Sequence, residues 1–197
     1  SASGNMYMTL VVKMDKIGIP LTLVPLRIGT LIAPSIRSRV GPSSSENVYL
    51  KWPNDVLIGD RKVCGTLIEI ENGRLLVGIG CNVAEAPVVP GAGADKGRSS
   101  TSIQEHAREG EQHDATAIAA EIIQATKDWL SSRDSAEYVV NDFESAMAKG
   151  AVQTLRNGPD EGKQVIPLRI NPDGTLHVKF AAGAVDGTFP GERTLIA

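Results

Sequence analysis

The stretch of sequence that decides the fold is Lys51–Asn82, KWPNDVLIGDRKVCGTLIEIENGRLLVGIGCN. It contains hydrophobic runs that are too short for a core helix and that end at polar residues. The Asn-Gly pair near its middle is the strongest short signal for a two-residue hairpin turn, so we expect Thr66–Ile70 and Leu75–Ile79 to pair as antiparallel strands. Polar residues at strand ends, held by a sheet beneath them, are typical of a binding site.

The composition of the chain limits its class. Its 197 residues are 42% hydrophobic, which is enough to bury a core, and the formal net charge of −3 disfavours nucleic acid as a partner. No run of apolar residues could cross a membrane and no signal peptide is recognisable, so we expect a cytoplasmic protein, with the mitochondrion as the alternative. Cys64 and Cys81 lie in apolar runs and are expected to be buried, reduced thiols. The scattered histidines are expected to be surface residues, and no metal site is predicted.

Hydrophobic periodicity predicts alternating strands and helices up to residue 149. The expected strands are Met6–Met14 (buried), Val48–Trp52, Val56–Ile58 and Lys62–Ile70, the last two joined by the turn Gly59–Arg61. The expected helices are Leu21–Val40, Ser102–Glu109, Asp114–Ser132 and Asp134–Lys149. Pro25 suits the first turn of the first helix, whereas Pro34 should kink or interrupt it. Ala84–Ser102 is rich in Gly, Pro, Ala and Ser and is expected to be a long mobile loop.

After Gly150 the pattern changes to short strands and tight turns, with strands expected at Lys163–Ile170, Thr175–Phe180 and Gly187–Phe189. We therefore expect an α+β fold, with a mixed or antiparallel sheet and packed helices in residues 1–149. A small β-domain should occupy residues 150–197.

Three groups of residues in the decisive stretch could carry chemistry. Trp52, Asn54 and Asp55 surround a proline turn that could cover a flat heterocycle, although a plain Asx-turn with a core tryptophan explains them equally well. Lys62 begins a strand with small residues beside it and could stabilise negative charge, or it could be a solvated turn lysine. Gly78–Asn82, GIGCN, lets a ligand approach the backbone and ends in an amide that could bind an adenine edge, although a glycine pair alone is a weak signal.

The combination of these motifs resembles the catalytic core of the biotin protein ligases. KWPND is followed by the lysine of RKVCGTLIE and then by GIGCN, which is similar to the family pattern of KWPND, a K-x-x-G strand and G-x-G-x-N. Gly4–Thr9 (GNMYMT) resembles the strand after the family's glycine/arginine-rich loop, and Ser100–Ile103 resembles its T-S-[LI] segment. The β-rich tail resembles, more loosely, the family's small SH3-like C-terminal domain.

The resemblance implies an enzyme, a biotin–[biotin carboxyl carrier protein] ligase. Biotin and ATP, with Mg²⁺, would give biotinyl-5'-AMP, and a lysine of a biotin carboxyl carrier domain would then take the biotin. Lys62 would contact the biotin carboxyl and the α-phosphate. The biotin pocket would be lined by Gly65, Leu67, Gly78 and Ile79, and the nucleotide would be bound by Trp52, Asn54, Asp55 and Asn82. Such chemistry needs positioning and charge stabilisation rather than a protein nucleophile.

One departure from the family concerns the G-R-G-x-x-G-R loop, which should precede Ser1. The sequence also lacks an initiator methionine, so we expect a fragment, and a chain of these residues alone should have little activity. Two rivals remain: a lipoate–protein ligase, and a non-catalytic truncated homologue that binds carrier domains. A homodimer is left open.

Overall fold

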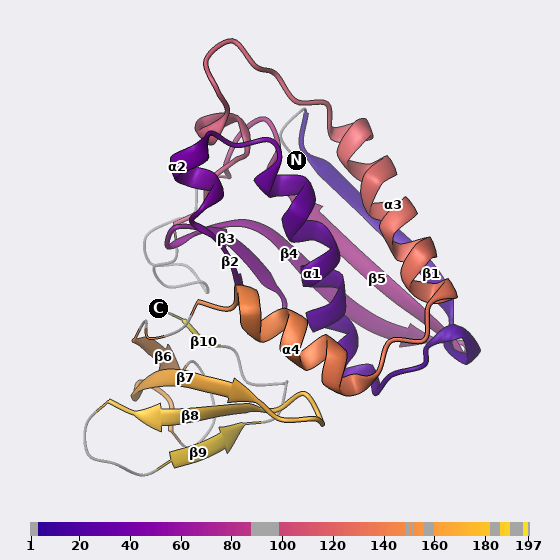
Figure 1. The fold of residues 1–197 in the computed structure, drawn as a ribbon, viewed down its shortest axis with the longest axis vertical. Coiled ribbons are helices and arrows are strands. Elements are labelled where there is room, and N and C mark those ends of the chain that lie inside the picture. Colours follow the sequence, from indigo (N-terminus) through magenta and orange to yellow (C-terminus); the bar gives the residue numbers. More distant parts are fainter. Residues whose placement is uncertain are drawn as a thin grey trace.

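The computed structural model describes residues 4–87, 99–148, 150, 152–155, 160–181, 186–189 and 195–196. The described residues form an α+β fold with two antiparallel sheets (Figure 1), as the sequence predicts. The first sheet has the strand order β1-β5-β4-β3-β2. Its strands are β1 (Met6–Lys13), β2 (Val48–Lys51), β3 (Asp55–Ile58), β4 (Arg61–Glu71) and β5 (Arg74–Cys81).

The central hairpin of this sheet confirms the pairing predicted from the Asn-Gly turn. Strands β4 and β5 run antiparallel with Thr66 opposite Ile79. Asn72 and Gly73 have φ angles of 49° and 70°, so both central turn residues lie in the left-handed region. This conformation matches the twist of a two-residue hairpin, which explains why Asn-Gly is the preferred pair there.

Strand β1 lies at the edge of the first sheet and pairs with β5. It was expected to be buried, and in this respect the prediction is wrong, because its side chains alternate between the two faces of the sheet. Tyr7 and Val11 are 57% and 56% exposed, whereas Met6 and Val12 are buried. Helices cover one face of the sheet and leave the other face open, so an apolar run need not be buried on both sides.

The helices pack on one face of the first sheet (Figure 1). They are α1 (Val24–Arg37), α2 (Pro42–Ser45), α3 (Ala115–Ser131) and α4 (Ala136–Ala146), with 3-10 turns η1 (Met14–Lys16), η2 (Leu21–Leu23) and η3 (Gln104–His106). Pro25 lies in the first turn of α1, as predicted. The expected interruption at Pro34 does not occur, since the helix continues to Arg37. Pro34 lies near the helix end, so its missing N–H affects only the last turn.

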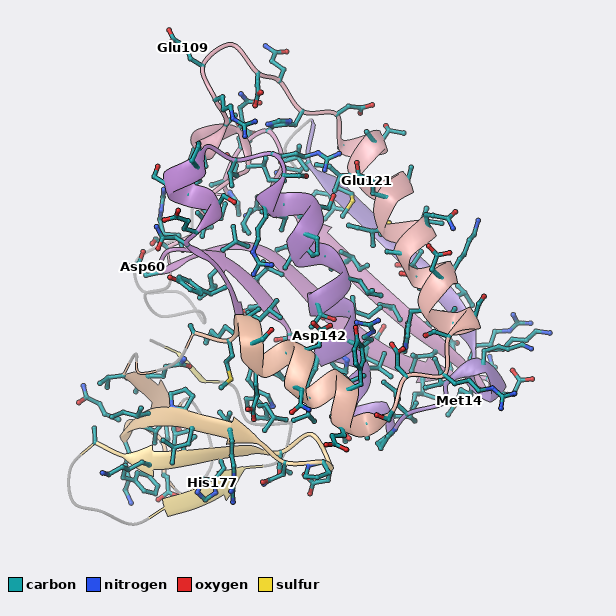
Figure 2. The ribbon with its side chains drawn as sticks, viewed as in Figure 1. Met14, Asp60, Glu109, Glu121, Asp142 and His177 are labelled. Atoms are coloured by element: carbon teal, nitrogen blue, oxygen red, sulfur yellow. The ribbon has the colours of Figure 1, made fainter. Side chains whose placement is uncertain are left out.

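Caps fix where the two later helices begin. The Asp114 carboxylate accepts from the Thr116 N–H at 2.8 Å, and the Ser135 hydroxyl accepts from the Tyr138 N–H at 3.1 Å. Helix α4 ends at Ala146, three residues earlier than expected. Figure 2 shows Glu121 on α3 and Asp142 on α4, each pointing towards α1. These carboxylates help to hold the helices together over the core.

The second sheet has the order β10-β6-β7-β8-β9 and lies beside α4 (Figure 1). Its strands are β6 (Gln153–Leu155), β7 (Gln164–Ile170), β8 (Leu176–Phe180), β9 (Asp186–Phe189) and β10 (Leu195–Ile196). The predicted short strands are confirmed, while the SH3-like fold stays a prediction. Most of the expected Ala84–Ser102 loop, residues 88–98, lies outside the described residues. Among the helices that the structure describes, none is long and apolar enough to cross a membrane.

Candidate functional site

Several glycines lie on the open face of the first sheet, which is the face that the helices do not cover. Gly80 lies opposite Gly65 on β4 and opposite Tyr7 on β1, and Gly78 lies opposite Leu67. Leu67 is 61% exposed, so its side chain projects from this face. An open hollow of about 370 Å³ lies against Tyr7–Thr9 and Gly78–Gly80. Because these glycines lack side chains, a ligand could approach the strand backbone closely.

Ile79 does not belong to this open face. It alternates with Gly78 and Gly80 along β5 and is only 3% exposed, so its side chain lies in the helix-covered core. Ile79 nevertheless lines the hollow together with Gly78 and Gly80, so its expected contact with a ligand stays a prediction and would not involve the buried side chain. Neighbouring residues of one strand point to opposite faces, so a side chain at position 79 points away from the hollow.

A β-bulge places Lys62 on the open face. Leu57 of β3 lies opposite Lys62 and Val56 lies opposite Cys64, so Val63 is an extra residue in β4. Lys62 and Gly65 are three positions apart and would point to opposite faces in a regular strand. The bulge reverses this alternation, and Val63 and Cys64 are both buried in succession. Lys62 and Gly65 therefore share the open face.

The Lys62 side chain lies directly over Gly65. A Cβ atom at Gly65 would lie 2.6 Å from Lys62 Nζ and 2.7 Å from its Cε, so any side chain there would force the lysine to move. The prediction that Lys62 points inward over a floor of small residues agrees with this geometry. Glycine is needed at position 65 so that the ammonium can rest against the strand.

Asp55 holds the ammonium of Lys62 in this position. Its Oδ1 lies 2.6 Å from Lys62 Nζ, and the Asp55 side chain is 13% exposed while that of Lys62 is 42% exposed. Asp55 Oδ1 is buried and accepts no well-angled hydrogen bond from the described residues, so the Lys62 ammonium is the charged group that this oxygen meets. A cation that is tethered on one side and open to solvent on the other can meet a negatively charged group of a ligand.

Trp52 belongs to the core rather than to a nucleotide surface. It is 2% exposed, and its Nε1 donates to the Gly174 carbonyl at 3.0 Å, in the turn between β7 and β8. An indole buried in this way has no free ring face on which a base could stack, so the core interpretation replaces the ligand-covering one. Asn54 is also engaged, because its Nδ2 donates to the Thr66 carbonyl at 2.6 Å. Both residues fix the turn that carries Asp55.

Asn82 directly follows β5 and lies beside Lys62. Its backbone N–H donates to the Val63 carbonyl at 2.8 Å, and its Nδ2 donates to the Thr101 carbonyl at 3.0 Å. The amide is half-buried and close to the bulge, so the structure brings it together with Lys62, Asp55 and Gly65 at one corner of the sheet. Its donor is used within the protein, which makes it a brace for the corner as well as a candidate ligand contact.

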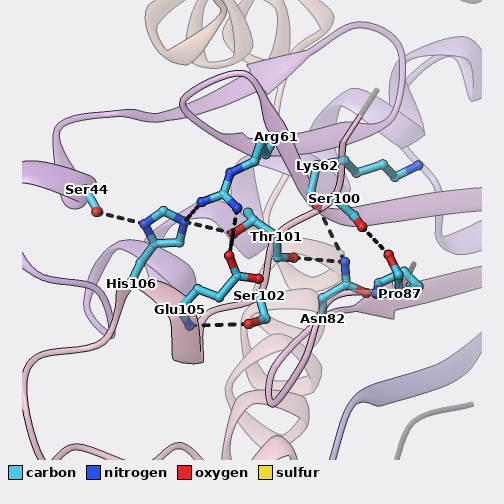
Figure 3. A network of polar contacts seen from close by, with 10 residues as sticks. All are labelled: Ser44, Arg61, Lys62, Asn82, Pro87, Ser100, Thr101, Ser102, Glu105 and His106. Atoms are coloured by element: carbon cyan, nitrogen blue, oxygen red, sulfur yellow. Dashed lines mark hydrogen bonds and ion pairs between the residues drawn. The ribbon is translucent and has the colours of Figure 1, made fainter. Parts of the chain in front are cut away.

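A polar network that sequence reasoning missed lies next to this corner (Figure 3). His106 was expected to be a surface residue, and this is wrong, because its ring contacts Ser44, Arg61 and Thr101 at 2.9 to 3.1 Å. Arg61 also forms an ion pair with Glu105 at 2.7 Å. Burial raises the pKa of Glu105, but hydrogen bonds from Arg61 and Thr101 outweigh it and leave that pKa below its usual value. No spacing rule connects these residues.

The two cysteines are free and buried, as predicted. Cys64 and Cys81 lie opposite each other across β4 and β5, on the helix-covered face. A hydrogen bond with Cys81, followed by burial, raises the pKa of Cys64 well above its usual value, so this thiol is not set up as a nucleophile. Within the described ranges, no three His, Cys, Asp or Glu residues gather as a metal-binding group.

Two comparisons of sequence match part of this chain. A model of the biotin/lipoate A/B protein ligase family matches residues 1–84. The bifunctional ligase/repressor BirA of Bacillus subtilis is 33% identical over 93 residues, which cover 44% of this chain and only 27% of that protein.

Solved structures extend the likeness to most of the chain. The biotin protein ligase of Leishmania major in complex with biotin is 28% identical, with a TM-score of 0.67, over 96% of this chain and 79% of that chain. The biotin protein ligase of Aquifex aeolicus in complex with biotin and ATP is 22% identical, with a TM-score of 0.74, over 98% of this chain and 78% of that chain. The second likeness concerns the fold alone. Residues 1–84 therefore match the biotin/lipoate A/B protein ligase family, and nearly the whole chain has the fold of the biotin protein ligases.

Proposed function

We propose that the protein is an ATP-dependent biotin protein ligase. The observation that carries this proposal is the Lys62 ammonium, held over Gly65 at the edge of an open, glycine-floored sheet face. The likeness to biotin ligases solved with biotin and ATP supports it, and it does not favour lipoate as the substrate. The match to BirA covers only 27% of that protein, so the activity and the substrates of this chain are part of the proposal.

The first step joins biotin to the nucleotide. An oxygen of the biotin carboxylate attacks the α-phosphorus of ATP, and the bond to the β-phosphate oxygen breaks to release pyrophosphate. Negative charge builds up on the α-phosphate oxygens during this displacement, and the Lys62 ammonium is placed to stabilise it. The product is a mixed anhydride, biotinyl-5'-AMP.

The second step transfers biotin to a protein. The neutral ε-amine of a lysine on a biotin carboxyl carrier domain attacks the anhydride carbonyl, AMP leaves with the bonding electron pair, and a proton is lost from nitrogen. Lys62 can stay charged throughout, since the adenylate already carries a good leaving group. This chemistry requires no nucleophile from the protein, in keeping with the buried, unactivated Cys64.

The proposed ligand contacts follow from the exposure of each residue. Gly65, Leu67 and Gly78 border the open face and would contact biotin, while Lys62, Asp55 and Asn82 meet at the nucleotide end. ATP would bring Mg²⁺ with it.

The domain division belongs to the same proposal. Residues 1–149 would form the catalytic core and residues 150–197 a small SH3-like domain. Support comes from the two separate sheets and from the position of the boundary, directly after α4.

Replacing Lys62 by alanine tests the proposal. We expect Lys62→Ala to lower the rate of biotinyl-AMP formation in the full-length protein on the order of 100-fold, since one preorganised charge contact is lost. Lys127→Ala, on the exposed side of α3, is the matched control and should leave the rate unchanged. Near-normal biotinyl-AMP formation by Lys62→Ala would remove Lys62 from the active site.

A further inference from the structure

The corner that carries Lys62 and Asn82 depends on a segment outside the sheet, Ser99–Ile103. The Lys62 N–H donates to the Ser99 carbonyl at 3.1 Å, and the Thr101 N–H donates to the Lys62 carbonyl at 2.9 Å. The Ile103 N–H donates to the Asn82 carbonyl at 2.9 Å. This segment therefore holds the backbones of both candidate site residues, so a shift of the segment would also shift Lys62 and Asn82.

Side chains rather than a long strand pairing anchor the segment. Thr101 is fully buried, and its hydroxyl donates to Glu105 Oε2 at 3.1 Å and contacts His106 Nε2 at 2.9 Å. Arg61 reaches the same two residues, with Nη1 at 2.7 Å from Glu105 Oε2 and Nη2 at 3.1 Å from His106 Nε2 (Figure 3). We call Arg61, Thr101, Glu105 and His106 the Arg61 cluster. It connects the start of β4 with η3.

His106 also links the Arg61 cluster to helix α2 and to Gly41 just before it. Its Nδ1 lies 3.0 Å from the Ser44 hydroxyl on α2, and its carbonyl accepts from the Gly41 N–H at 2.8 Å. The imidazole therefore bridges α2 and the Arg61 side chain. Removing it would free the segment from two elements at once.

The partners of His106 determine its protonation state. Arginine has only donors, and the Thr101 hydroxyl has one proton to share between Glu105 and Nε2, so Nε2 acts as an acceptor while it is unprotonated. The proton of the neutral ring then lies on Nδ1 and points to Ser44. A second proton would remove the acceptor and place a cation against the guanidinium. Burial and then the Arg61 charge lower the pKa of His106, with the Glu105 carboxylate opposing them. Ser44 and Thr101, its other neighbours in the network, carry no charge.

We propose that Arg61, Glu105 and His106 are positioning residues, which set Lys62 and Asn82 in their working places by fixing Ser99–Ile103, and that they do so while His106 is neutral. This inference rests on the proposed ligase function for its catalytic consequence. The bracing itself does not, because it concerns the main chain of Lys62 and Thr101 with or without a ligand. None of Arg61, Glu105 and His106 has to touch biotin or ATP.

The experiment measures the bracing and the catalysis separately in the full-length protein. Amide hydrogen exchange of Lys62 and Thr101, followed by NMR from pH 5 to 8, reports the bracing. The kcat and the KM for ATP of biotin-dependent adenylation report the consequence. We expect His106→Ala to raise both exchange rates by roughly 10-fold or more and to lower kcat by about 10-fold, as local opening misplaces the catalytic cation.

His106→Gln is the conservative variant, because its side-chain oxygen can still accept from Arg61 but cannot take up a proton. It should restore most of the kcat and keep both amides protected from exchange. In the wild-type protein, kcat and amide protection should fall at low pH as His106 takes up a proton, and His106→Gln should remove this fall. His177→Ala, a partly exposed histidine on β8, is the control and should behave like wild type.

Two results would overturn the proposal: unchanged exchange at Lys62 and Thr101 in His106→Ala, or faster exchange with unchanged kcat and KM. A wild-type protein that forms no biotinyl-AMP, while its exchange still responds to His106→Ala, would overturn the ligase function and support the bracing. The failure of one idea is thus distinguishable from the failure of the other.

Discussion

Gly65 is the residue at which the proposed geometry can be tested with the smallest chemical change. A Cβ at this position would lie 2.6 Å from Lys62 Nζ, 2.7 Å from Lys62 Cε and 3.2 Å from Asp55 Oδ1. The atoms it meets first are the far end of a flexible lysine, so the lysine should move and the strand should stay. Gly65→Ala is therefore expected to displace the ammonium from the corner without unfolding the sheet.

The magnitudes of the two effects differ in a useful way. A displacement of about 1 Å or more in a positioned catalytic group costs on the order of 100-fold in rate. Stability should change little, since alanine is favoured over glycine in a strand by about 0.5–1 kcal/mol and this offsets the lost ion pair. For a chain of this size we expect the thermal midpoint to shift by less than about 4 °C.

The assay is biotin-dependent exchange of labelled pyrophosphate into ATP, with thermal unfolding as the check on folding. Gly18→Ala is the matched control, because a Cβ there meets nothing within 4 Å. A double variant, Lys62→Ala with Gly65→Ala, shows whether Gly65 acts through Lys62, in which case it is no slower than Lys62→Ala alone. Wild-type exchange in Gly65→Ala, or a double variant at least 10-fold slower than Lys62→Ala, would refute this reasoning.

Three further predictions concern the fold that carries the site. Trp52→Phe removes the hydrogen bond to Gly174 and should lower the free energy of unfolding by about 1 kcal/mol in urea titrations; no change would show that this bond contributes nothing. Hydrogen bonds from Arg39 and then Ser35 lower the pKa of Glu121 from 4.5 to about 2, so its stabilisation should be present above pH 4.5 and lost as the pH falls through 2. Because Glu121 is half exposed, the difference from Glu121→Gln should stay below about 1 kcal/mol, and a difference that grows towards low pH would contradict the assignment. Gly73→Ala places a side chain at φ 70° and should destabilise by about 1–2 kcal/mol, measured by thermal unfolding against Gly18→Ala.

Much of the fold could be predicted because local signals agree with the tertiary arrangement. The Asn72-Gly73 turn specifies the β4–β5 hairpin, and Asp114 caps α3 where the periodicity begins. The buried edge strand was predicted wrongly, because a run such as Met6–Lys13 does not show which face of a sheet is covered. Burial depends on what packs above the strand, and that is decided far away in the sequence.

Some members of the candidate site could be named from the sequence, but its geometry could not. Lys62 and Gly65 could be named from their motif, yet only the bulge at Val63 places them on the same face. A regular strand would have separated them, and no residue of that segment is diagnostic of a bulge. The role of Trp52 was left open between core and ligand contact, and its burial against the Gly174 turn could not be foreseen from local pattern.

The Arg61 cluster was not predicted at all. Its members come from β4, from the segment before η3 and from η3 itself, and Arg61 lies 45 positions from His106. A single histidine without a nearby cysteine or carboxylate motif gives no signal in sequence. The chain returns beside Lys62 at Ser99–Thr101, and this brings the His106 imidazole to the Arg61 guanidinium. The cluster could therefore be found only from the structure.

The formation of biotinyl-5'-AMP by the full-length protein is the most direct measurement of its function. The protein is incubated with MgATP and labelled biotin, or with lipoate in parallel, and a biotin carboxyl carrier domain is added after the adenylate has been quantified. We predict that biotin gives the adenylate, that the label moves to a carrier lysine, and that lipoate gives neither product. Adenylation and transfer of lipoate alone, or binding of the carrier domain without any adenylate, would contradict the proposed function.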